Sequence, residues 1–364
     1  MSSSERVDNS FARMETATIN NQVPYEEQKM SKTLKRSLLL LNCILLGIGN
    51  CCAPLMSRLY FLKGGKGVWL SSFLETAGWP FILFPLFVSY VYRRSKEGPG
   101  TKIFYIQPRL FLPCSILGIL TGLDDYLYAF GVARIPVSTS ALLISTQLAF
   151  TAGFAFLLVR QKFTSFGINA IFLMTLGGIV LALHTSGDRP NNESKTQYFM
   201  GFFTTLGASA LYGFVLPAIE LTYKKAKQTI TYTLVMEMQL IMSFFATAFC
   251  AVGLLANHEF PKIPREAKVF QLGEASYYGV IIGCALLWQC FFMGAVGVIS
   301  CASSLLSGVL IAALLPVTEI LAVLIFSEKF QVEKGIALAL SVWGFISYFY
   351  GEVEEKKKKN RSPE

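Results

Sequence analysis

The feature that most constrains this chain is a series of long, nearly uncharged apolar segments. A helix needs roughly 20 mostly apolar residues to cross the hydrocarbon of a membrane. Charged residues make up only 15% of the 364 residues, against about 25% in soluble domains, and they cluster between the apolar segments. The sequence therefore predicts an all-α polytopic membrane protein with ten transmembrane helices. The expected spans are 37–57, 68–92, 111–133, 138–159, 165–184, 201–221, 234–256, 275–296, 301–326 and 333–351.

The net charge of +9 has a simple explanation in such a protein. Most of the lysines and arginines fall in the two tails and in the loops on the same side. By the positive-inside rule this predicts that both termini are cytoplasmic. We expect a disordered tail at 1–36 and a basic tail at 352–364, whose lysine run faces anionic membrane lipid. We expect no nucleic-acid partner.

An internal repeat divides the expected spans into two sets of five. An odd number of spans per half gives halves of opposite orientation, as in many transporters. This predicts inverted halves at 37–184 and 201–351, joined by an external loop at 185–200. The repeat consists of three ordered matches at offsets of about 165: FAFLLVRQKF with LAVLIFSEKF, Pro54 and Tyr60 with Pro217 and Tyr223, and Glu75 with Glu237.

Several carboxylates lie inside the expected spans, where a charged side chain costs about 2.5–3.5 kcal/mol on insertion scales. Each could be a protonated carboxyl group bonded to a neighbouring helix. Few basic residues lie in these spans to pair with them, however, and burial without a cation favours exchange of a proton near neutral pH. That property suits proton-coupled transport. The candidates are Glu75, Asp124, Asp125, Glu237 and Glu319.

Helical spacing separates the two adjacent acids of the third span. Asp125 shares a face with two glycines suited to close helix packing, whereas Asp124 shares a face with Thr121 and Tyr128. We therefore expect Asp124 to act in proton coupling, together with Glu75 and Glu319. The residues expected to be structural are Asp125, Pro54, Pro217 and Glu237; the prolines would bend their helices.

Amides and aromatic rings near span centres suggest a flat ligand with polar edges. Asn and Gln can bond the donor and acceptor edges of heterocycles, and rings can stack on them. Core packing explains these residues equally well, so the residues alone indicate only a carrier for a small solute. The expected substrate-binding residues are Asn50, Glu75, Tyr128, Gln147, Trp288, Gln289 and Phe292.

Other functional classes lack their signals in this sequence. The eight cysteines form no C-x-x-C pair and only two histidines exist, so we expect no metal or cofactor. The G-x-G-D motif of intramembrane aspartyl proteases and the H-E-x-x-H motif of zinc proteases are absent. Ten spans with a repeat argue against a seven-helix receptor, and no loop resembles a channel filter. An intramembrane enzyme or receptor remains the alternative from another class.

Four blocks of sequence resemble the plant purine permease family, within the drug/metabolite transporter superfamily. The resemblance runs over residues 34–352 and is carried by long, ordered motifs. They are RLYFLKGGKGVWLSSFLETAGWP at 58–80, LDDYLYAFGVARIPVSTSALLISTQLAF at 123–150, LWQCFFMGAVG at 287–297, and the block from SSLLSGVLIAALLPVTEI to SYFYGE at 303–352. One departure is Lys63, where the family usually has His or Asn.

The resemblance implies a fold of ten helices in two inverted halves and proton-coupled uptake of adenine, related purines and cytokinins. It leaves import of alkaloids or vitamin B6-type compounds as the alternative. The family has an acid at the position of Asp124 and Asn or Asp at that of Asp125, which agrees with the roles inferred above. The resemblance also implies the plasma membrane, although the sequence leaves the vacuolar membrane and the oligomeric state open.

Overall fold

The computed structural model describes residues 32–134, 143–183, 195–326 and 332–361, and this part of the chain is all-helical. The described residues from Arg36 onward form one compact unit. The helices are α2 (Lys32–Leu62), α3 (Val68–Thr76), α4 (Pro80–Glu97), α5 (Pro108–Val132), α7 (Gln147–Val159), α8 (Ser165–Leu183), α9 (Lys195–Lys225), α10 (Tyr232–Ala256), η1 (Phe260–Lys262), α11 (Ile263–Val269), α12 (Glu274–Cys301), α13 (Ser304–Phe326) and α14 (Val332–Arg361).

The apolar segments of the sequence become helices of membrane-crossing character. The described residues contain eight helices long and apolar enough to cross a membrane, and two shorter apolar helices at Leu143–Val159 and Ser165–Gly177. The architecture is that of a polytopic helical membrane protein, as expected. The count of ten crossings stays a prediction.

The helix boundaries differ from the expected spans in several places. Helix α9 begins at Lys195, within the expected external loop at 185–200. The second span is interrupted between α3 and α4, because Pro80 lacks the N–H that would continue the helical hydrogen bonds. Helix α14 continues to Arg361 through the expected basic tail, since its Glu and Lys residues are good helix formers. Helix α2 begins at Lys32 within the expected N-terminal tail, whose residues 1–31 lie outside the described part.

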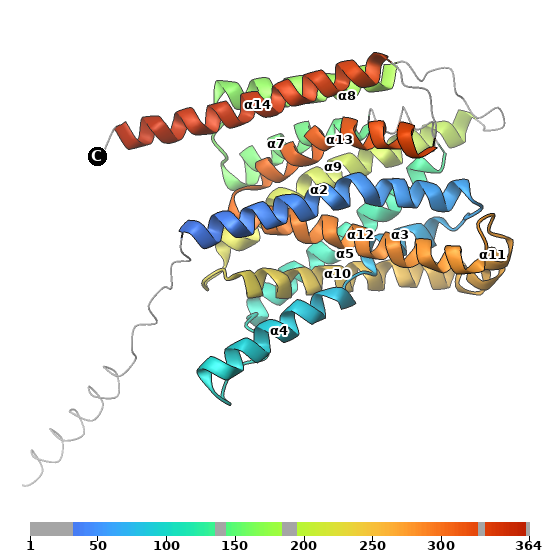
Figure 1. Cartoon of the computed structure of the whole chain (residues 1–364), viewed down its shortest axis with the longest axis horizontal. Coiled ribbons are helices and arrows are strands. Elements are labelled where there is room, and N and C mark those ends of the chain that lie inside the picture. The colour runs from blue at the N-terminus through green and yellow to red at the C-terminus, as the bar shows by residue number, and fades with distance from the viewer. Residues whose placement is uncertain (1–31, 135–142, 184–194, 327–331, 362–364) are drawn as a thin grey trace, which may run out of the picture. The chain divides into compact units, whose positions relative to one another are not determined.

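The helices lie side by side along a common direction (Figure 1). Helix α14 packs along α8 at one edge of this view, and α5 packs against α3, α9 and α10 in the interior. Helix α4 lies at the opposite edge, where Ile82 and Leu86 meet Met236 of α10. Large apolar side chains such as Phe84 and Phe87 are exposed on α4. Such a surface suits a helix that faces lipid.

Helices α2 and α12 approach each other closely at glycines. A Cβ atom added to Gly49 would lie 2.3 Å from the backbone nitrogen of Phe291, and one added to Gly294 would lie 2.3 Å from that of Leu46. Real Cβ contacts are essentially never this short, so both positions require glycine at this helix separation. Small residues at an interface allow backbones to approach, which is how many membrane helices pack.

Candidate functional site

A cavity of about 660 Å³ lies among α2, α3, α5, α7, α9, α12 and α13. Its lining reaches from Asn50 in the middle of α2 to Lys66 in the connection between α2 and α3. Two cations, Arg58 and Lys66, line the part nearest that connection. The cavity brings together many residues singled out from sequence: Asn50, Pro54, Glu75, Asp124, Asp125, Tyr128, Gln147, Trp288 and Phe292.

One wall of the cavity carries three buried acids. Glu75 of α3 is 2% exposed, and Asp124 and Asp125 of α5 are 7% and 4% exposed. The carboxyl groups of Glu75 and Asp125 share a side-chain hydrogen bond. Such a bond needs a proton on one of the two groups, because an ionised carboxylate only accepts. One oxygen of each aspartate, Asp124 Oδ1 and Asp125 Oδ2, has no partner among the described residues.

The second wall is aromatic and comes mainly from α12. The indole Nε1 of Trp288 donates to Ser57 Oγ at 3.1 Å, which fixes the orientation of the ring. The rings of Trp288 and Phe292 lie 6.2 Å apart, and Tyr212 of α9 stacks on Phe291 at 5.9 Å. Sequence reasoning missed Ser57 and Tyr212. Tyr212 is a phenol inside an apolar span, the same signal that identified Tyr128.

The deep end of the cavity is crossed by a reciprocal link between α2 and α13. Pro54 has no N–H, so the carbonyl of Asn50, four residues earlier, lacks its helical donor. Thr318 Oγ1 lies 3.3 Å from that carbonyl oxygen and 3.2 Å from that of Leu314, so its one proton is shared between the two acceptors. Asn50 Nδ2 donates to the carbonyl of Ile311 at 3.4 Å. Asn50 therefore joins two helices as well as lining the cavity. Thr318 is a further lining residue that sequence reasoning missed.

The structure places Gln289 outside this lining. Successive helical residues are turned by about 100°, so when Trp288 and Phe292 face the cavity, Gln289 faces the neighbouring side. It lies against Gly78, in the turn between α3 and α4. Its side chain is 5% exposed, and neither amide atom has a hydrogen-bond partner among the described residues.

The remaining predicted residues either do not line the cavity or have side chains outside the described part of the structure. Glu237 Oε2 accepts from the backbone N–H groups of Tyr105 at 2.8 Å and Ile106 at 2.9 Å, and so holds the connection that leads into α5. Pro217 lies inside α9 and does not line the cavity. Glu319 falls in α13, and its side chain lies outside the described part of the structure.

Two glutamates that sequence reasoning passed over hold the segment beside Lys66. Glu266 of α11 accepts from the hydroxyl groups of Tyr60 at 2.8 Å and Tyr277 at 3.2 Å. Glu259 accepts from the N–H of Leu70 at 3.0 Å, and so caps the N-terminus of α3. Burial raises the pKa of Glu259 above its ordinary value.

The acids do not form a metal centre among the residues that are described. Within those residues, no group of three or more histidine, cysteine, aspartate or glutamate side chains could hold a metal ion. The site instead combines carboxyl groups, amides, hydroxyl groups and rings around one cavity. This arrangement can bind a polar-edged organic solute and exchange a proton beside it.

Comparison of the sequence with known proteins shows to which family the chain belongs. Residues 37–358 match a family model described as purine nucleobase transmembrane transport. The chain is 52% identical to purine permease 3 of Arabidopsis thaliana over 90% of this chain and 93% of that protein. It is also 52% identical to purine permease 2 of the same plant over 89% and 94%, and 36% identical to probable purine permease 5 over 82% and 81%.

A solved crystal structure shares the fold. It superposes with a TM-score of 0.58 at 14% identity, covering 86% of this chain and 98% of its own. The relatives are named as permeases, which are transporters and not enzymes. The extent of the family match and the identity to these relatives lead to one conclusion: this chain is an integral membrane protein that belongs to the purine permease family.

Proposed function

We propose that the protein imports purine bases and derivatives such as adenine and cytokinins, together with protons, by alternating access. The observation that carries this proposal is the cavity of about 660 Å³ that combines buried acids, amides and aromatic rings. Its volume falls within the roughly 300–1,000 Å³ of small-molecule sites. The names of the relatives support purines as the substrate class.

In this proposal the base stacks against the aromatic wall and bonds the amides with its edges. Trp288 and Phe292 offer ring faces, and the hydrogen bond that the indole donates to Ser57 holds the Trp288 ring in place. Gln147 of α7 offers both a hydrogen-bond donor and an acceptor through its amide, whereas an ionised acid of α3 or α5 only accepts. A cavity larger than a bare base leaves room for substituents, and so also for alkaloids or vitamin B6-type compounds.

The proton is carried on the acidic wall. We assign coupling to Asp124 and Glu75, and Glu319 remains a candidate from the sequence. The bond between Glu75 and Asp125 supports a shared proton at this wall, so Asp125 takes part in addition to its packing role. Import of a neutral base with one proton moves one positive charge inward, worth about 2.3 kcal/mol per 100 mV.

The transport cycle follows from two inverted five-helix halves that rock around the cavity. With cytoplasmic termini, the connection between α2 and α3 faces the outside. The lining that reaches Lys66 then supports an outward-facing state, and the glycine contacts between α2 and α12 support closure of the cytoplasmic side. The plasma membrane is the proposed location.

Uptake in cells that express the chain tests both substrate and coupling. Labelled adenine should accumulate faster at acidic external pH, and a protonophore should abolish the accumulation. Competition by unlabelled trans-zeatin, caffeine, nicotine and pyridoxine ranks the alternatives. Saturable uptake that ignores both pH and the protonophore would refute the coupling, and preference for pyridoxine or nicotine over adenine would refute the purine assignment.

Two variants separate the roles of the walls. Asp124→Asn should abolish concentrative uptake while exchange of labelled for unlabelled adenine continues. Trp288→Ala should raise the KM for adenine. Glu274→Gln provides a matched control, because this exposed acid lies at the start of α12 outside the cavity lining. Unchanged pH-driven uptake in Asp124→Asn would remove Asp124 from the mechanism.

A further inference from the structure

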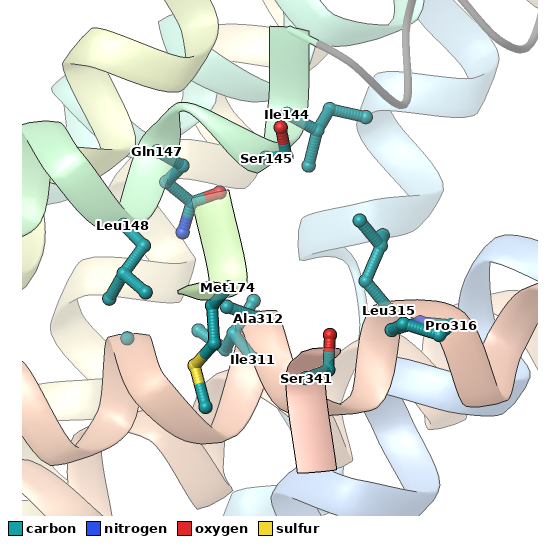
Figure 2. Close-up of a pocket in the computed structure, with 11 residues that line it drawn as sticks. Ile144, Ser145, Gln147, Leu148, Met174, Ile311, Ala312, Leu315, Pro316 and Ser341 are labelled. Carbon is teal, nitrogen blue, oxygen red and sulfur yellow. The ribbon is translucent and has the colours of Figure 1, made fainter. Parts of the chain in front are cut away.

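A small second pocket lies behind one wall of the central cavity, among α7, α8, α13 and α14 (Figure 2). Its volume is about 20 Å³. Four residues line both spaces: Ile144, Gln147, Ile311 and Leu315. Gln147 therefore stands in the wall between the pocket and the proposed substrate site.

Polar groups from three helices meet at this pocket. The Gln147 side chain is 9% exposed and that of Ser341, from α14, is 2% exposed. Figure 2 shows the amide of Gln147 and the hydroxyl of Ser341 pointing toward the same space. The hydroxyl of Ser145 also belongs to the lining.

The third helix, α13, contributes a backbone acceptor. Pro316 lies inside α13 and lines the pocket, as does Ala312. Because proline has no N–H, the carbonyl of Ala312, four residues earlier, is deprived of its helical donor. A buried carbonyl without a donor is costly, so it calls for a partner from outside the helix.

Size and chemistry together select one ligand. A water molecule needs roughly 10–15 Å³ and two to four polar partners. The pocket offers that volume, and its lining includes the polar side chains of Gln147, Ser145 and Ser341. The space is far too small for a purine ring. We propose that this pocket holds a single ordered water, hydrogen-bonded to the Gln147 amide, the Ser341 hydroxyl and the Ala312 carbonyl.

The water makes Ser341 a positioning residue for Gln147. It ties the amide to α13 and α14 from behind, so that the amide presents a fixed edge to the central cavity. Water-mediated bonds of this kind are nearly as favourable in enthalpy as direct ones. The effect on transport rests on the proposed function, whereas the water itself rests only on the pocket.

The first experiment is therefore a density map of the full-length protein at a resolution that reveals ordered waters. We expect a peak within hydrogen-bonding distance of the Gln147 amide, Ser341 Oγ and the Ala312 carbonyl oxygen. A map with ordered waters at other buried sites and no peak here would overturn the proposal. This result stands whether or not adenine is the substrate.

The second experiment compares Ser341→Ala with Thr175→Val by adenine uptake. Thr175 is a matched control on α8, because its hydroxyl is buried without a partner among the described residues and does not line the pocket. Loss of one hydrogen bond predicts a rise of about threefold to tenfold in KM for Ser341→Ala, with similar maximal uptake and melting temperature. Thr175→Val should leave KM unchanged.

The two variants also separate a positioning role of Ser341 from a structural one. Equal KM values for Ser341→Ala and the wild type would overturn the positioning role of Ser341. A lower melting temperature with unchanged KM would reduce Ser341 to a structural residue and equally overturn it. If the wild type itself takes up no adenine, the proposed function fails, and the density map still decides the water site.

Discussion

Replacement of Gly49 by alanine tests the close backbone contact between α2 and α12. The added Cβ would lie 2.3 Å from the nitrogen, 2.5 Å from Cα and 2.7 Å from Cβ of Phe291. Two of these are backbone atoms, so no rotation of a side chain can relieve the contact. Ordinary van der Waals contact begins near 3.4 Å, and α2 and α12 would have to separate by about 1 Å.

The expected cost combines two opposing effects. Overpacking of a well-packed interior costs typically about 1–3 kcal/mol, and a contact with backbone belongs at the upper end. Alanine gains about 1 kcal/mol over glycine in helix propensity. The net loss should therefore be about 2 kcal/mol, and the melting temperature of the detergent-solubilised protein should fall by about 3 °C.

Gly47 supplies the matched control on the same helix. A Cβ there would meet only Leu314 Cδ1, at 3.8 Å, which is an ordinary contact. Gly47→Ala should therefore be neutral or stabilising. Thermal unfolding followed by size-exclusion chromatography measures both variants, and uptake assays report whether the looser α2–α12 contact also slows transport. Equal melting temperatures for Gly47→Ala and Gly49→Ala would refute the close-packing argument.

Three further changes test other parts of the structure. Thr318→Val keeps the shape but leaves the Asn50 carbonyl without its donor, so thermal unfolding should show a loss of about 1 kcal/mol; an unchanged melting temperature would contradict the link across the cavity. Glu237→Gln replaces a charged acceptor of two backbone N–H groups by a neutral one and should lower the free energy of unfolding by about 1 kcal/mol. Proteolysis of the α4–α5 connection should become faster, and greater protease resistance there would contradict this. Because burial raises the pKa of Glu259, the native state binds more protons than the unfolded chain, and this contribution to stability is lost as pH rises through the raised pKa. The melting temperature of the wild type should therefore fall more steeply with rising pH than that of Glu259→Gln, and parallel curves would count against the assignment.

The two adjacent aspartates show how far helical spacing carries a site prediction. Spacing placed Asp125 on a glycine face and Asp124 on a polar face, and both acids line the cavity. What spacing could not supply was the partner of Asp125. Glu75 lies 50 residues earlier in the chain and reaches Asp125 because α3 packs against α5. A contact between helices depends on which of their faces pack together, and the residue spacing within one helix does not determine this.

Repeated residues likewise need not share a role. Glu75 and Glu237 match in the proposed repeat, yet Glu75 lines the cavity and Glu237 holds a connecting segment. Gln289 looked like a ligand-binding amide because it adjoins Trp288, but one helical step turns it to another face. Tyr212 and Thr318 were missed because a phenol or hydroxyl within an apolar span is common. Such a group does not by itself indicate which face of its helix lines a cavity.

The sequence by itself determined that this is a helical membrane protein and which spans carry polar groups. Membrane thickness sets the length of an apolar helix, and the free energy of burying a charge makes each intramembrane acid conspicuous. The tertiary structure alone decided which of those groups face one cavity and which carbonyls freed by proline find a partner. Those outcomes depend on the rotation and separation of packed helices, which close contacts such as Gly49 against Phe291 fix.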